Sequence, residues 1–366
     1  MRLPVCCRCP VNTGGSPRQS GVALITVLLI VFLASMTAVS LSMIQQIAIR
    51  RSAVLQHQQQ ARLYTLGVEQ WAGLILLRDR RDNEIDHPGE AWANLPAMLP
   101  VENGQLSGKI RDLQGCFNLN NLWQAAPGAA PEPPEATPES QKTAPDAENP
   151  PLPNSPNSPN SPDTEKSAGQ GKIHPEQLKV LQRLLNNVEV NPELAQAIAD
   201  WIDPDTDPLF PDGAEDSEYT VRNPPYLAAN QPMLSVSELR LVKGVDQEVY
   251  DRLVPLVCAL PPGTPLNVNT AAAPVLAALD EHAQPADLER VLKERPAQGY
   301  QNVDEFLNAA QLTPDAPTKA LLSTDSQYFL LQAEARLGDG RAVLSSTLFR
   351  DENGVRVLRR SFGNQD

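Results

Sequence analysis

One stretch of the sequence, residues 22–44, restricts the fold more than any other feature. It reads VALITVLLIVFLASMTAVSLSMI and contains no charged residue. As an α-helix it would be ~35 Å long, which is enough to cross the hydrocarbon core of a bilayer. The preceding basic residues keep the N-terminus in the cytoplasm under the positive-inside rule, although Arg50 and Arg51 on the far side weaken the bias. The sequence therefore predicts a single-pass membrane protein.

A secretory signal peptide and a simple signal anchor are the alternatives for this stretch. A signal peptide has an apolar region of about 7–15 residues that ends at a small-residue cleavage site. Here the apolar run is longer, and Gly21 stands before it rather than after it. The arrangement favours a leader at residues 1–21 followed by a membrane helix over a cleaved secretory signal; a signal anchor remains open.

The helical pattern continues beyond the membrane segment. Residues 45–82 contain no proline, and helix-forming residues dominate. We expect one helix over residues 22–81, ~90 Å long. The apolar residues expected to form the face that packs on a soluble domain are Leu63, Leu66, Trp71, Leu74 and Ile75.

The C-terminal region shows the alternation typical of β-strands. Every second residue from Phe329 to Leu337 is apolar. Turn sequences at 338–340 and 351–354 lead into two further strand candidates, residues 341–350 and 355–362. A short strand is also expected at residues 106–113. The sequence predicts an antiparallel sheet formed by segments far apart in the chain.

Two different segments lie between these regions. Residues 125–171 hold 12 of the 35 prolines and three consecutive Asn-Ser-Pro repeats, so we expect a disordered insertion. Residues 172–325 have a helical pattern, with helices expected over 175–187 and 192–202 and a capping box at Ser235 and Glu238. The expected fold class is α+β, with a sheet-containing domain interrupted by a large all-α insertion.

The charge of the chain is concentrated in one acidic segment. The net charge is −14, which disfavours nucleic-acid binding. Residues 200–218 contain eight acids and no base. Three of them have the spacing of the first EF-hand ligands, but Pro208 and Ala214 stand where an EF-hand needs Gly and Glu. Oxygen ligands on a loop suit Ca²⁺; a solvated acidic loop and a paired-carboxylate hydrolase are the alternatives.

Two cysteines, Cys116 and Cys258, lie far from the three in the leader. In an oxidising compartment they would be the pair available for a disulfide. Closing so long a loop would contribute ~4–5 kcal/mol in the chain-entropy model.

A second function class rests on residues 239–245, which resemble a helix-hairpin-helix turn, and on residues 266–271, which are similar to those of DNA-uptake proteins. Residues 233–325 carry 7 basic and 13 acidic side chains, a net charge of −6 that repels DNA. Packing between helices is favoured, and a membrane-anchored DNA-uptake component is the alternative function.

Four short motifs occur in this order: GCFNL at 115–119, ADWIDPD at 199–205, PYLAANQPMLSVSEL at 225–239 and LNVNTA at 266–271. With these motifs the chain resembles the K-type minor pseudopilins of the type II secretion system over most of its length, excluding the proline-rich segment. The wider pilin class has Glu at the fifth mature position, where this chain has Thr26. The K family typically lacks that Glu as well, and a subunit at the filament tip has no neighbour above it to pair with one.

The resemblance implies a non-enzymatic protein at the tip of a periplasmic pseudopilus, assembled with I-type and J-type minor pseudopilins for protein export across the outer membrane. Prepilin peptidase would cut between Gly21 and Val22 and methylate Val22. The anchor would lie in the inner membrane and the bulk of the chain in the periplasm. The family's calcium binding implies Ca²⁺ ligands among Asp203, Asp205, Asp207, Asp212, Glu215 and Asp216.

The expected domain organisation follows from these assignments. The segments are a leader (1–21), a transmembrane helix (22–44), the first part of a pilin-like domain (45–124), the proline-rich insertion (125–171), the α-helical insertion (172–325) and the second part of the pilin-like domain (326–366).

Overall fold

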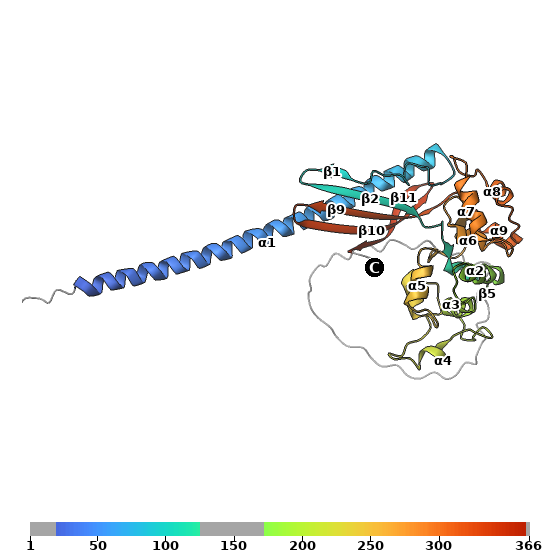
Figure 1. Ribbon diagram of the computed structural model, residues 1–366, viewed down its shortest axis with the longest axis horizontal. Coiled ribbons are helices and arrows are strands. Elements are labelled where there is room, and N and C mark those ends of the chain that lie inside the picture. The colour runs from blue at the N-terminus through green and yellow to red at the C-terminus, as the bar shows by residue number, and fades with distance from the viewer. Residues whose placement is uncertain (1–19, 125–171, 364–366) are drawn as a thin grey trace, which may run out of the picture.

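The computed structural model describes residues 20–124 and 172–363. The predicted proline-rich insertion and nearly all of the predicted leader lie outside the described residues. A single helix, α1 (Ser20–Asp82), runs from the predicted membrane segment into the body of the molecule, as expected. Its first half stands clear of the rest of the protein, and its second half lies along a sheet (Figure 1).

The sheet has five antiparallel strands in the order β1-β2-β9-β10-β11. They are β1 (Leu99–Val101), β2 (Gly104–Asp112), β9 (Tyr328–Leu337), β10 (Gly340–Asp351) and β11 (Gly354–Phe362). The strands predicted from period-two alternation are confirmed. The apolar residues of β9 from Phe329 to Leu337 are buried against α1. The hairpin partner β1 was not predicted, because its three residues are too few to show alternation.

The predicted packing face of α1 is confirmed only in part. Leu66 and Ile75 are partly buried and pack against the core between α1 and the sheet, whereas Leu63, Trp71 and Leu74 are exposed. The fully buried positions of the helix include Ala61, Ala72 and Leu76. Small residues lie at the contact because the helix approaches the sheet closely: a Cβ added to Gly108 of β2 would lie 3.0 Å from Val68 Cγ1.

A charged residue also lies on the buried face of α1. Glu69 is 2 % exposed, yet Arg360 of β11 donates to its carboxylate at 2.7 Å and Ser346 of β10 donates to it as well. The buried carboxylate of Glu69 is therefore paired with an arginine at the edge of the sheet.

The insertion is helical, with paired strands of two residues each. Its first part contains β3 (Phe117–Asn118), η1 (Leu119–Leu122), β4 (Trp123–Gln124), β5 (Lys172–Ile173), α2 (Pro175–Asn187), α3 (Leu194–Ile202), α4 (Asp216–Tyr219), η2 (Val236–Leu241), α5 (Gln247–Leu253) and β6 (Val257–Cys258). Its second part contains β7 (Leu266–Asn267), α6 (Ala273–Ala277), α7 (Pro285–Lys293), α8 (Val303–Ala310), α9 (Ala316–Ala320) and β8 (Leu322–Ser323).

The sequence located several of these elements. Helix α2 has the predicted bounds, and the capping box of Ser235 and Glu238 is present at the start of η2. Helix α3 begins at Leu194 rather than at the predicted Pro192, with Glu193 as its N-cap. The structure pairs β3 with β6, β4 with β5 and β7 with β8, so in the described part of the insertion distant segments of the chain meet at three points.

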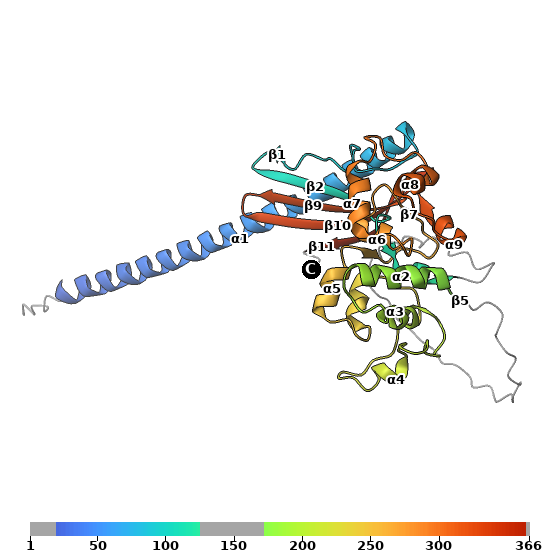
Figure 2. The ribbon, with the colours of Figure 1, turned by 45° about the vertical axis from the view of Figure 1, so that its right-hand side comes forward.

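Two hydrophobic cores result. One core fills the insertion, and the other lies between α1 and the sheet. The insertion lies at the end of the sheet remote from the free half of α1, and a second view shows the same arrangement (Figure 2). A smaller apolar cluster that includes Cys116, Leu260 and Tyr328 lies where the insertion meets the sheet.

Candidate metal centre

Helix α3 and the loop after it build the acidic site. The helix is amphipathic, so Ile198 and Ile202 enter the insertion core and hold its C-terminal end rigidly. Asp203 caps that end, with its backbone N–H bonded to the carbonyl of Ala199 at 3.0 Å. The acidic loop therefore begins at a residue that is bonded to the end of α3.

Asp200 organises the loop from inside. Its carboxylate is fully buried and accepts hydrogen bonds from the backbone N–H groups of Leu209 and Ala214, the latter at 2.7 Å. A Cβ on Gly213 would overlap this carboxylate, so only glycine fits there. Burial raises the pKa of Asp200 to about 6. Because its oxygens already accept these bonds, Asp200 shapes the loop.

Three carboxylates converge beside this turn. One oxygen each of Asp203, Asp205 and Glu215 lies within 4.8 Å of the others. Asp203 is 4 % exposed and Glu215 is 3 % exposed, whereas Asp205 faces solvent. The structure therefore brings together three of the six acids expected as calcium ligands.

The buried oxygens of this group lack donors. Within the described residues, Asp203 Oδ1 and both carboxylate oxygens of Glu215 have no hydrogen-bond partner. Burial and then the neighbouring charge of Asp205 raise the pKa of Asp203 to about 8. Burial and then the charge of Asp200 raise the pKa of Glu215 to about 7. Two buried carboxyls without donors are costly, and a cation among them would remove that cost.

The other three expected ligands lie apart from the group. Asp207 is exposed, and its N–H donates to Asp205 at 2.9 Å. Asp212 is half-buried, and its N–H is held by Gln196 at 2.8 Å. Asp216 accepts from the N–H of Ala228 at 2.9 Å. Their part in metal binding stays a prediction.

Asn230 was not among the predicted ligands, although it lies inside one of the four sequence motifs. Its amide nitrogen donates to the carbonyl of Asp205 at 3.0 Å, and its buried Oδ1 has no partner among the described residues. It occupies the left-handed region with φ 47°. Asn230 therefore holds the backbone of one residue of the carboxylate group, from a position far along the chain.

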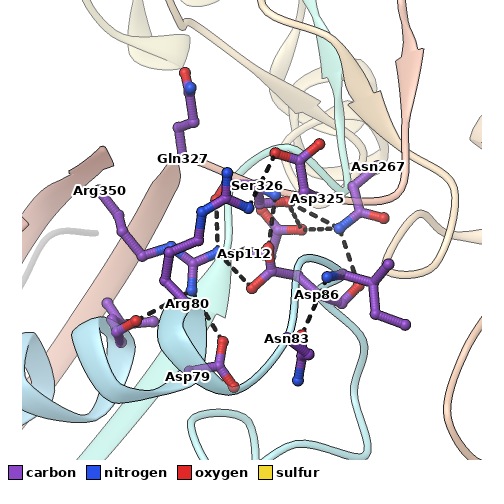
Figure 3. A network of polar contacts seen from close by, with 12 residues as sticks. Asp79, Arg80, Asn83, Asp86, Asp112, Asn267, Asp325, Ser326, Gln327 and Arg350 are labelled. Atoms are coloured by element: carbon purple, nitrogen blue, oxygen red, sulfur yellow. Dashed lines mark hydrogen bonds and ion pairs between the residues drawn. The ribbon is translucent and has the colours of Figure 1, made fainter. Parts of the chain in front are cut away.

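A second acidic cluster differs from the first in its partners. Asp79, Asp86 and Glu90 also lie within reach of one another, but Arg350 reaches between the first two (Figure 3). Its guanidinium donates to Asp79 at 2.9 Å and to Asp86 at 2.7 Å. Glu90 accepts from the indole N–H of Trp92 at 2.7 Å. Every carboxyl of this cluster accepts a hydrogen bond. The guanidinium of Arg350 occupies the position that a metal cation would otherwise take.

The hairpin considered for DNA is present as a turn between η2 and α5, with Gly244 at φ 82°. Its basic side chains are engaged elsewhere. Arg240 lies 4.2 Å from the centroid of the Tyr250 ring, and Lys243 pairs with Glu218 at 3.7 Å. These contacts favour packing within the protein over phosphate binding.

Several asparagines in or directly beside the motifs are buried and clamp the backbone. Asn120, which follows the motif at 115–119, accepts from the N–H of Met233 at 2.7 Å and donates to the carbonyls of Met233 and Leu260. Asn269 exchanges two hydrogen bonds with the backbone of Tyr300. Asn267 donates to Asp112, Ser326 and the carbonyl of Asp86, and so joins the insertion to the sheet domain. The motifs therefore position backbone segments.

The remaining predicted site residues lie elsewhere. Gly21 and Val22 belong to the first turns of α1. Cys116 and Cys258 are buried free thiols at the meeting point of the insertion and the sheet. The disulfide stays a prediction.

Comparisons with known proteins agree on one family. The family model described as type II secretion system protein K matches residues 115–262 in its first domain and residues 266–325 in its second. A type II secretion system protein K of Pseudomonas aeruginosa is 35 % identical over 357 residues, covering 94 % of this chain and 93 % of the relative. One from Aeromonas hydrophila is 34 % identical over 362 residues, covering 95 % of this chain and 98 % of the relative.

A solved structure is similar as well. It is the GspK-GspI-GspJ complex from the type 2 secretion system of enterotoxigenic Escherichia coli. The match has a TM-score of 0.65 and 29 % sequence identity, and it covers 86 % of this chain and 100 % of the solved chain. The long helix, antiparallel sheet and helical insertion therefore form an arrangement already seen in a solved protein.

Proposed function

Because the chain belongs to the protein K family of the type II secretion system, we propose that it caps or nucleates the tip of the pseudopilus that exports proteins across the outer membrane. The observation that carries the proposal is the position of the insertion. It lies at the end of the sheet opposite the free half of α1 (Figures 1 and 2). In a filament held together by its long helices, such a mass would obstruct a subunit stacking above it.

The anchor supports the same role. Among the described residues, one helix is long and apolar enough to cross a membrane, with a mean hydropathy of 2.5 in its most apolar window. Every described side chain from Leu24 to Arg50 is exposed. The helix would hold the chain in the inner membrane with its N-terminus in the cytoplasm and its folded part in the periplasm. Cleavage between Gly21 and Val22 by prepilin peptidase, with methylation of Val22, would release it for assembly.

The partners would be an I-type and a J-type minor pseudopilin, because the similar solved chain belongs to a GspK-GspI-GspJ complex. Leu63 and Leu74, which the sheet leaves 67 % and 65 % exposed, supply an apolar face along α1 for helix packing. The role would be structural rather than enzymatic: the relatives are named as components of the secretion system, and Arg350 pairs with the carboxyls of one of the two acidic clusters.

Two measurements on protein from its native membrane test this function. Intact mass and N-terminal sequencing should give a chain that begins at methylated Val22. Immunogold labelling of isolated pseudopili should place the protein at one end. An unprocessed N-terminus, or gold particles spread along the filament, would contradict the proposal.

We propose in addition that the acidic site binds Ca²⁺ through Asp203, Asp205 and Glu215. The unpartnered buried oxygens support this, and carboxylates on a loop suit an ion that takes six to eight oxygens. Asn230 and the other three predicted ligands, Asp207, Asp212 and Asp216, would complete the shell. A bound ion would neutralise the carboxylates and fix the loop on α3, so its effect would be on stability and not on chemistry.

The calcium proposal predicts a loss of the response to calcium in Glu215→Gln. Calorimetry on the full chain in detergent should show a melting temperature that rises when EGTA is replaced by about 1 mM Ca²⁺. A ligand present at about 100 times its dissociation constant adds about 2.7 kcal/mol. Glu215→Gln should lose most of this rise. Glu218→Gln lies on the same segment but pairs with Lys243, so it is the control and should keep the rise. An equal rise in both variants would remove Glu215 from the site.

A further inference from the structure

The face of the sheet turned away from α1 has a trough. Gln332 and Glu334 of β9 alternate with the apolar residues buried against α1, so their side chains lie on this face. A cavity of about 580 Å³ lies over them. It is lined by Leu95, which lies beside β2, and by Gly363, whose N–H donates to the carbonyl of Val343 in β10 at 3.0 Å. The trough therefore crosses β2, β9 and β10.

A row of polar side chains lies along the floor of the trough. Lys109 of β2 is opposite Gln332, and Gln332 is opposite Ser345 of β10. Side chains directly opposite one another in an antiparallel sheet are neighbours on the same face. Ser345 is 7 % exposed, and its Oγ has no hydrogen-bond partner among the described residues. A buried hydroxyl without a partner, at the floor of a trough, indicates a place for a polar atom of a ligand.

The trough is positively charged, although the whole chain has a net charge of −14. Lys109 is exposed, and no acid within residues 20–124 and 172–363 pairs with it. Glu334 is the acid that lines the described part of the cavity, and its carboxylate accepts from Arg336 and, at 2.8 Å, from Arg341. These basic side chains outnumber the acid by three to one, so the trough attracts anions.

We propose that this trough binds an acidic peptide segment of a partner protein. A carboxylate of the segment pairs with Lys109 and Arg341, and an oxygen beside it accepts from the hydroxyl of Ser345. An apolar side chain next to the acid lies against Leu95. Charge complementarity selects an acidic occupant over a basic or a purely apolar one. The site is separate from the acidic loop and from the exposed apolar face of α1.

The pairing of the strands decides how the segment lies. β9 is paired with β2 on one side and with β10 on the other, so its backbone has no free edge for an added strand. Recognition is therefore by side chains, with the segment lying across the strands. Neighbouring strands are ~4.8 Å apart, so a segment of about six residues, ~20 Å long when extended, spans the trough from Leu95 to Gly363.

A binding assay on the full chain in detergent tests the preference for an acid. The probe is a fluorescein-labelled peptide of about six residues in which aspartate and leucine alternate. The control peptide has asparagine in place of aspartate. Fluorescence anisotropy should rise with the aspartate peptide alone, and the affinity should fall about tenfold between about 50 mM and about 500 mM NaCl. Equal binding of the two peptides, or no binding of the aspartate peptide, would overturn the proposal.

Three variants locate the binding site. Lys109→Glu should weaken binding of the aspartate peptide about tenfold, because it reverses the unpaired cation. Ser345→Ala should weaken binding about threefold, since one hydrogen bond is lost, and its melting temperature should not fall, since the hydroxyl has no described partner. Lys293→Glu on α7 is the control, because it changes the net charge equally at an exposed lysine of the insertion. An equal loss in the two lysine variants would show a general charge effect and no site.

Photo-crosslinking in the native cell identifies the occupant. A photoreactive phenylalanine analogue replaces Gln332, which is exposed in the middle of the trough, and mass spectrometry sequences the cross-linked peptides. The expected peptide comes from another protein and has Asp or Glu within about three residues of the cross-link, the reach of a segment that spans the trough. Adding Lys109→Glu should abolish this cross-link.

The other possible occupants are distinguished in the same experiment. Cells that express chains of two isotopic compositions separate a second copy from the same chain. A cross-link to residues 200–218 of a second copy would replace the partner protein with self-association and overturn the proposal. A cross-link to residues 364–366 of the same chain would do so as well. A cross-link that persists unchanged in Lys109→Glu would show that the cation does not select the occupant, and it would also overturn the proposal.

Discussion

Arg350 lies where α1, the sheet and the insertion meet. Its side chain is 2 % exposed, and it bonds to Asp79, to Asp86 and to the carbonyl of Ser326 at 2.8 Å. Replacing it with Met should lower the free energy of unfolding by about 3–5 kcal/mol, because the change leaves buried carboxylates without their counter-charge. Urea unfolding at about pH 7.5 measures this loss.

Arg78→Met is the matched control for Arg350. Arg78 pairs with Asp82 at 3.7 Å on the surface of the same helix, and its loss should cost less than about 1 kcal/mol. At about pH 5 the cost of Arg350→Met should shrink, since protonated carboxyls need no counter-charge. Equal costs for the two variants near pH 7.5 would show that the buried pair contributes little.

At the scale of single residues, the sequence predicted part of the acidic site. It placed Asp203, Asp205 and Glu215 among the candidates, because acid density on a loop is visible in the chain. It could not separate them from Asp207 and Asp212, since the difference is which carboxylates converge within 4.8 Å of one another, and that depends on how the loop folds around Asp200. Asn230 could not be predicted for another reason: it is 25 residues from Asp205 in the chain, and only the fold brings its amide to the Asp205 carbonyl.

At the scale of elements, regular patterns were predictable and short ones were not. Period-two alternation identified β9, and an amphipathic pattern identified α2. The paired strands β3 and β6 have two residues each and carry no periodicity. The face of α1 was only partly predicted: Leu66 and Ile75 pack on the core, but Leu63 and Leu74 were also expected inside, where the close approach of the sheet admits Ala61 and Ala72.

The pairing of β4 with β5 predicts that the proline-rich segment can be shortened. Trp123 lies opposite Ile173 and Gln124 opposite Lys172, so the segment leaves and rejoins the fold at one place. Deleting residues 131–162 leaves enough chain to join these ends. The melting temperature should change by less than about 3 °C, since the free-energy cost of closing a loop varies slowly with its length. Calorimetry on the shortened chain measures it; a transition lowered by about 10 °C would show that the segment stabilises the fold.

For the whole molecule, the joint between the two cores should make stability depend on pH. Asp79, Asp86 and Asp112 gather there around Arg350, with Glu90, His87, Thr270, Ser326 and Asn267 facing them. Burial, then the charges of Glu90 and Asp86, raises the pKa of Asp79 to about 7. Burial raises the pKa of Asp112 to about 6 and that of Asp86 above its usual range. The folded joint therefore holds protons that the unfolded chain, with ordinary carboxyl pKa values near 4, has released.

The sign of the effect follows from this difference in bound protons. Between about pH 4 and pH 7 the folded state binds more protons than the unfolded state, so the free energy of unfolding falls as the pH rises and levels off above pH 7. Urea midpoints at pH 5, 6, 7 and 8, measured with saturating Ca²⁺ so that the acidic loop stays ionised, should decrease through this range. Asp79→Asn removes one titrating group and should flatten the decrease, whereas Asp339→Asn, exposed in the turn between β9 and β10 and remote from the joint, should not. A midpoint that rises from pH 5 to pH 7 in the native chain would show that the guanidinium of Arg350 keeps these carboxyls ionised and that the joint holds the two cores by charge pairing alone.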